Sequence, residues 1–172
     1  MDIPRTPQFG AILYRATQLI VQQGQDAFDH LGIEFDARKI SIVLCIHKLG
    51  PLTSSQISSE LGHSRQLVES RLKQLVNENF LTGVQADYDS RKKVYGFSAD
   101  SAYLVESIVR SMMNFEAVYS KLWSEIGCDL EDTMLRFEEA LANKPLSRRY
   151  DEYKLSSDMQ NQISIDTQEI LS

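Results

Sequence analysis

Residues 53–98 have the sequence TSSQISSELGHSRQLVESRLKQLVNENFLTGVQADYDSRKKVYGFS. Thr53 and Ser64 are good helix N-cap residues, and Gln56 lies three positions after Thr53, in the spacing of a capping box. Gly62 permits the sharp turn that joins two helices. The first half of this stretch therefore predicts two short helices connected by a tight turn.

The second half of the stretch has a different composition. The runs Leu81–Val84 and Lys93–Phe97 are short and contain β-branched and aromatic residues, and the turn-forming residues 85–92 separate them. This pattern predicts a β-hairpin with a long tip. A helix-turn-helix followed by a hairpin is typical of a winged helix-turn-helix, so we expect a mainly α-helical protein with a small β-hairpin wing.

Helical periodicity dominates the rest of the chain. Together with cap and stop signals, it predicts helices near Pro7–His30, Ala37–Leu49, Thr53–Leu61, Arg65–Asn79, Asp100–Gly127 and Leu130–Ala142. We expect an N-terminal dimerisation helix (1–35), a winged helix-turn-helix lobe (36–99), C-terminal dimerisation helices (100–155) and a polar tail (156–172). The tail lacks aromatic residues and is expected to be partly disordered.

The predicted fourth helix places its polar residues opposite an apolar face formed by Val68, Leu72, Leu75 and Val76. In a helix-turn-helix, the exposed face of the second helix enters the DNA major groove. Arg65 can bind guanine and Gln66 can bind adenine, each through two hydrogen bonds. The predicted DNA contacts of the two helices are Thr53, Ser54, Ser64, Arg65, Gln66, Glu69, Ser70, Arg71 and Lys73.

Glu69 is unusual among these residues because a carboxylate repels phosphate. It can accept a hydrogen bond from cytosine N4, or it can orient Arg65 through an ion pair between residues four apart. The ion pair is the favoured interpretation.

The hairpin tip carries a cluster of basic residues, Arg91, Lys92 and Lys93. Arg91 can insert into a narrow minor groove, and Asp89 can hold its guanidinium in place. The alternative is a solvated charged turn. We favour the DNA contact because the cluster directly follows a helix-turn-helix.

The net charge is −6, which by itself argues against nucleic acid as a partner. The charge is unevenly distributed: residues 53–98 carry 6 basic and 5 acidic residues, whereas residues 99–172 carry 7 basic and 14 acidic residues. The acidic excess therefore lies outside the segment predicted to bind DNA.

The segment 52–104 resembles the MarR family of bacterial transcription regulators. The similarity lies in the turn SSELGHSRQLV, the helix exit KQLVNENFL, and the wing DYDSRKK, which matches the family pattern D-x-D-x-R. The step Phe97-Ser98 corresponds to the family's Leu-Thr. Ser70 replaces a phosphate-binding arginine, for which Arg71 can substitute, while Ser101 replaces a glycine and Ser58 an alanine.

The resemblance implies a homodimer in which the first and last helices of both chains interlock. Apolar stripes along these helices support a dimer independently. A two-fold dimer implies a pseudo-palindromic operator with half-sites about 34–36 Å apart. Family members commonly act as repressors released by a small molecule, often an aromatic acid. The candidate effector-binding residues are Arg15, His30, Arg38 and His47.

Other classes of function have less support. The sequence contains no G-x-x-x-x-G-K-[ST], G-x-S-x-G or H-E-x-x-H motif, so we expect no enzyme. Cys45 and Cys128 form no metal-ligand pattern, and we expect neither a metal nor a cofactor. No secretory signal or membrane span is evident, which favours the cytoplasm. Two alternatives stay open: a winged-helix protein-binding module that does not bind DNA, and an oxidation-sensing regulator.

Overall fold

The computed structural model describes residues 8–86 and 89–157. The chain forms two compact units, residues 1–114 and 115–172, and each is described by itself. The expected mainly α-helical fold with a small β wing is confirmed. None of the helices in the described residues has the length and apolar character needed to span a membrane.

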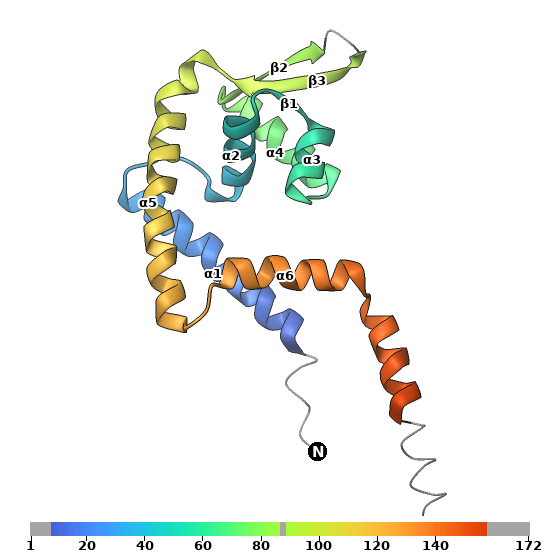
Figure 1. Cartoon of the computed structure of the whole chain (residues 1–172). Helices are drawn as coiled ribbons and strands as arrows, with labels where there is room; N and C mark the ends of the chain where they lie inside the picture. The colour runs from blue at the N-terminus through green and yellow to red at the C-terminus, as the bar shows by residue number, and fades with distance from the viewer. Residues whose placement is uncertain (1–7, 87–88, 158–172) are drawn as a thin grey trace, which may run out of the picture. The chain divides into compact units, whose positions relative to one another are not determined.

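The first unit contains the winged helix-turn-helix (Figure 1). Its elements are α1 (Phe9–His30), η2 (Ala37–Lys39), α2 (Ile40–Leu49), β1 (Leu52–Thr53), α3 (Ser54–Leu61), α4 (Arg65–Asn77), β2 (Leu81–Ala86), β3 (Asp89–Phe97), η3 (Ala99–Ser101) and the start of α5 (Ala102–Ile126). The second unit contains the end of α5 and α6 (Leu130–Asn143), and residues 146–157 are also helical.

The helix-turn-helix begins and turns where the sequence predicts. Thr53 forms a capping box with Gln56: its hydroxyl oxygen accepts from the Gln56 backbone N–H at 3.3 Å, and the Gln56 Oε1 accepts from the Thr53 N–H at 2.9 Å. Ser64 caps α4 by accepting from the Leu67 N–H at 3.3 Å. Gly62 has a φ of 63°, in the left-handed region, which ends α3 and starts the turn.

The sheet extends beyond the predicted hairpin. Its strand order is β1-β3-β2, with both pairs antiparallel. We did not predict β1, a two-residue strand in which Leu52 pairs with Tyr95 and Thr53 with Val94. β2 and β3 are longer than expected because pairing continues to Ala86 and Asp89 across an irregularity in register.

Several helix boundaries also differ from expectation. α4 ends at Asn77 instead of Asn79, because Asn79 has a φ of 55° and reverses the chain toward β2. The helix over 146–157 was not predicted, and it includes the first two residues of the expected tail. Residues 158–172 of that tail lie outside the described residues.

The core of the first unit fixes α4 against its neighbours. Val68, Leu72 and Leu75, predicted to point inward, are at most 1% exposed, and Ile57 of α3 is fully buried with them. A chain of aromatic contacts, Phe28–Phe35, Phe35–Phe80 and Phe80–Phe97, has ring centroids 6.4, 5.0 and 5.9 Å apart. These contacts connect the end of α1 with the residues that follow α4 and with the end of β3.

A buried lysine binds Glu78, the residue that directly follows α4. The Lys39 side chain is 6% exposed, and its Nζ donates to Glu78 Oε1 at 2.5 Å, whereas Glu78 is 51% exposed. The start of α2 and the end of α4 are therefore joined by a charge-assisted hydrogen bond.

Replacing Glu78 with alanine should lower the free energy of unfolding by about 1–3 kcal/mol, because it leaves a buried ammonium group without its partner. Half-exposure of the carboxylate keeps the loss below that of a fully buried pair. Urea unfolding measures the difference, and Glu60→Ala on α3 is the control, since Glu60 is exposed. Equal losses in the two variants would contradict this role for Glu78.

Large apolar side chains remain exposed in both units. In the first unit, α1 exposes Phe9, Ile12, Leu19 and Ile20. In the second, none of the residues of α6 is buried, and the exposed apolar residues of α6 and of 146–157 include Leu135, Leu146, Tyr150, Tyr153 and Leu155. Exposed apolar surface of this extent is typical of interaction surfaces.

Candidate nucleic-acid interface

A shallow groove of about 350 Å³ lies where the first turn of α3, the exposed side of α4 and the wing meet. Its lining residues are Thr53, Ser54, Ser55, Arg65, Glu69, Arg91, Lys92, Lys93 and Tyr95. The structure therefore brings together seven of the 13 residues predicted from the two helices and the wing. Ser55 and Tyr95 were missed.

The groove has a strongly basic lining. Arg65 of α4 and the wing residues Arg91, Lys92 and Lys93 are exposed, and Glu69 is the acidic residue of the lining. Clustered cations of this kind raise the local concentration of phosphate even when the whole protein is acidic. The positive charge of the groove is therefore complementary to the phosphates of a DNA backbone.

The remaining predicted residues of α4 divide into two groups. Ser64, Gln66, Ser70 and Lys73 are exposed but do not line the groove. Arg71 is partly buried, and burial lowers the pKa of its guanidinium, while the Asp36 carboxylate opposes that shift. Arg71 does not line the groove, and the charges of Asp36 and Arg38 act on it. Its role as a substitute for an arginine at position 70 stays a prediction.

The predicted contact between Asp89 and Arg91 is present in the wing. Asp89 Oδ1 accepts from the Arg91 backbone N–H at 3.0 Å and from Arg91 Nε at 3.2 Å. These hydrogen bonds, the backbone one first, hold the pKa of Asp89 below its usual value. Asp89 is 22% exposed and Arg91 is 89% exposed, so the carboxylate orients a guanidinium that remains available to a ligand.

The favoured ion pair between Glu69 and Arg65 is not formed. Across residues 8–86 and 89–157, neither side chain has an ion-pair or hydrogen-bond partner. Glu69 instead lies near Tyr95, whose pKa is raised by burial and then by the Glu69 charge. Tyr95 fits there because Gly83 faces it: a Cβ at position 83 would lie 3.1 Å from the tyrosine ring.

The turn between α3 and α4 explains one departure from the family pattern. The Ser58 hydroxyl donates to the His63 carbonyl at 2.7 Å, a bond that alanine cannot form. His63 Nδ1 is buried and has no partner among the described residues. Burial, and then the nearby Arg71 charge, lower the pKa of His63, so a neutral imidazole fits this turn.

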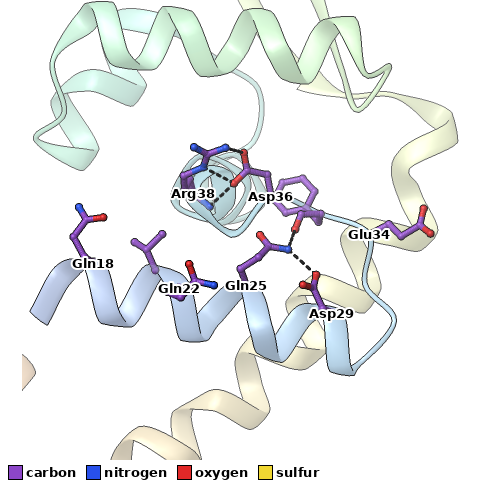
Figure 2. A pocket seen from close by; sticks show the side chains of 9 residues that line it. Gln18, Gln22, Gln25, Asp29, Glu34, Asp36 and Arg38 are labelled. Atoms are coloured by element: carbon purple, nitrogen blue, oxygen red, sulfur yellow. Dashed lines mark hydrogen bonds and ion pairs between the residues drawn. The ribbon is translucent and has the colours of Figure 1, made fainter. Parts of the chain in front are cut away.

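The predicted effector-binding residues are not brought together. A hollow of about 620 Å³ lies between α1 and η2 and contains Arg38, but Arg15, His30 and His47 do not line it (Figure 2). The remaining lining residues are Gln18, Val21, Gln22, Gln25, Asp29, Glu34, Phe35 and Asp36. This lining is rich in amides and carboxylates.

Within this hollow, Arg38 binds its neighbour Asp36. Its Nε and terminal nitrogen donate to the two oxygens of Asp36 at 2.9 and 2.8 Å, which lowers the pKa of Asp36 (Figure 2). Gln25 is also satisfied, donating to Asp29 and to the Phe35 carbonyl while accepting from the Ala37 N–H. The Arg38 side chain is nevertheless 69% exposed, and a guanidinium has five N–H donors, so donors that Asp36 does not use remain accessible to an acid.

The cysteines provide no evidence of a redox centre. Cys45 is buried and its pKa is raised, chiefly by burial, so its thiolate is disfavoured. Cys128 is exposed. The described residues contain no group of His, Cys, Asp and Glu side chains arranged to hold a metal ion.

No protein-family model and no curated protein sequence matches this chain. Solved structures do share its fold. The PcaV transcriptional regulator from Streptomyces coelicolor, in complex with its natural ligand, is 10% identical with a TM-score of 0.63, covering 84% of this chain and 98% of that one. The transcriptional repressor CouR, bound to a 23-mer DNA duplex, is 14% identical with a TM-score of 0.61, covering 83% and 99%.

A putative MarR-like transcription regulator from Bacillus cereus is 12% identical with a TM-score of 0.60, covering 80% of this chain and 98% of that one. These similarities span nearly the whole length of the other proteins. The chain therefore has the winged-helix fold of MarR-type regulators.

Proposed function

We propose that this protein is a sequence-specific DNA-binding transcription regulator that acts as a homodimer. The observation that carries the proposal is the basic groove between α4 and the wing, in which Arg65, Arg91, Lys92 and Lys93 line one surface. The fold shared with regulators, one of them solved on a DNA duplex, supports the proposal.

In this proposal α4 enters the major groove with its N-terminal end first. Arg65 and Gln66 contact base edges there, while Ser64, Thr53 and Ser54 bind phosphate with the helix N-termini. Ser70 and Lys73 are further contacts along α4. The wing residues Arg91, Lys92 and Lys93 bind the adjacent backbone or minor groove, with Arg91 oriented by Asp89.

The exposed apolar residues of α1 and α6 support the homodimer, since burying them requires a second surface. We propose that segments 1–35 and 100–155 form the dimer and that segment 36–99 binds DNA. The operator is then pseudo-palindromic, because a two-fold dimer presents two identical lobes. Selection of genomic fragments by the purified protein tests this directly: enriched inverted repeats support the proposal, and the absence of any enriched sequence contradicts it.

We also propose that the protein is a repressor released by a small molecule. Such a ligand would stabilise a dimer whose recognition helices are wrongly spaced for DNA. The solved complex of the PcaV regulator with its natural ligand supports a ligand-responsive fold. Titration of the protein–DNA complex with aromatic acids tests the ligand class, and a complex that stays intact throughout the series contradicts it.

Gln66→Ala should relax the preference at one base position in each half-site by about 1–3 kcal/mol, because it removes a two-bond contact to a base edge. Binding to duplexes with single substitutions, measured by fluorescence anisotropy, gives the loss at each position. Gln74→Ala is the control, since Gln74 is exposed on the same helix, does not line the groove and is not a predicted DNA contact. If the variant loses the same affinity for every duplex, with no position-specific change, Gln66 contacts the DNA backbone and not a base.

A further inference from the structure

Glu69 is a carboxylate on the exposed face of α4 and lines the same groove as Arg65 and the wing cations. Although these cations are close, it forms no ion pair or hydrogen bond within the described part of the chain. Its charge therefore remains available at the surface that faces DNA in the proposed function.

A free carboxylate in a phosphate-binding groove weakens binding to every DNA sequence, because it repels the backbone. On the DNA side, the repulsion is offset where a hydrogen-bond donor faces the carboxylate. The oxygen atoms of the sugar-phosphate backbone are hydrogen-bond acceptors and cannot supply a donor, so the donor has to belong to a base.

The position of Glu69 on α4 directs it to base edges. It lies one helical turn after Arg65, which corresponds to a rise of about 6 Å along the axis. Residues four apart share one face of a helix, so both side chains face the same stretch of major groove. Arg65 is only a donor and Glu69 is only an acceptor, and the two therefore select opposite base patterns.

Cytosine is the base that fits an acceptor-only side chain. Its major-groove edge presents the N4 amino donor, whereas adenine places the N7 acceptor beside its amino group. Guanine and thymine present acceptors there, which would repel the carboxylate. We propose that Glu69 selects cytosine at one position of each half-site and penalises other sequences. This inference rests on the proposed function, since it assumes that α4 enters the major groove.

Glu69→Gln tests the inference, because glutamine keeps the size of the side chain and removes its charge. Wild type and variant are each used to select sites from a library of duplexes with a randomised central segment. Wild type should enrich cytosine at one position per half-site. The variant should lose that preference by about tenfold, with adenine favoured instead, and bind a duplex of random sequence several-fold more tightly. Other positions should keep their preferences.

Glu60→Gln is the matched control, because Glu60 is exposed on α3 and does not line the groove. It should select the wild-type sites. Retention of the wild-type preference at every position in the Glu69 variant would overturn the inference, as would a uniform gain in affinity with no change in base preference. Failure of the wild type to select any sequence would overturn the proposed function itself, which is a different result.

Discussion

Replacing Arg91, Lys92 and Lys93 together with alanine should weaken DNA binding by about a hundredfold or more at physiological salt. These wing cations line the groove beside α4, and Arg91 is held by Asp89 in an exposed orientation. Each phosphate contact releases counterions, so the loss of three cations from each of two protomers should also reduce the salt slope, by about 5. The fold should be unaffected, because all three side chains are exposed.

Fluorescence anisotropy across a series of salt concentrations measures both quantities. The control replaces Lys48, an exposed cation of α2 that lies outside the groove and outside the segments proposed to form the dimer. If the control variant loses as much affinity as the wing variant, total charge and not the wing determines binding. An unchanged affinity in the wing variant would make the hairpin tip a solvated turn.

Leu72→Ala should lower the free energy of unfolding by about 2–5 kcal/mol. Leu72 is 1% exposed in the middle of α4 and belongs to the buried cluster that includes Ile57 and Val68. Truncation removes apolar contacts and leaves a cavity beneath the recognition helix. A loss of this size is a large part of the stability of a typical domain, so DNA binding should fail at lower temperature than in the wild type.

Leu67→Ala is the matched control, since Leu67 is on the same helix but 39% exposed. Its expected loss is below about 1 kcal/mol. Urea unfolding at one protomer concentration compares the two, because the stability of a dimer depends on concentration. Similar losses for both leucines would contradict the proposed burial of this face of α4.

The sequence predicts those features that local chemistry determines. The capping box of Thr53, the cap of Ser64 and the left-handed Gly62 depend on neighbouring residues, and all three are present. The inward face of α4 follows from its helical period. The hydrogen bonds between Asp89 and Arg91 join residues two apart and were predicted for the same reason.

Features that depend on distant residues were missed. β1 has only two residues and forms because Leu52 meets Tyr95, more than 40 residues away in sequence. Tyr95 reaches the groove because Gly83 on the neighbouring strand leaves room for its ring. Which residues face each other across two strands depends on the register of their pairing. The sequence alone does not determine that register when the hairpin has a long tip.

The partners of two charged residues were not predicted, for a common reason. The ion pair between Glu69 and Arg65 was expected from spacing. The favourable order places the acid four residues before the base, as in the pairs Glu106–Arg110 and Asp132–Arg136, whereas Arg65 precedes Glu69. Effector binding by Arg38 stays a prediction, and what the sequence did not predict is that its neighbour Asp36 holds it through two hydrogen bonds. In both cases the spacing of charges along the chain did not determine which partner each charge has.

The salt dependence of DNA binding by the wild-type protein tests the central claim most directly. If the groove binds the DNA backbone through the wing cations of two protomers, a plot of the logarithm of the association constant against the logarithm of salt concentration should have a negative slope at least as steep as about −5. The same plot for the wing variant should be shallower by about 5, and the contacts of α3 and α4 should account for the slope that remains. A wild type that binds no duplex at low salt, or binds with a slope near zero, would contradict the account.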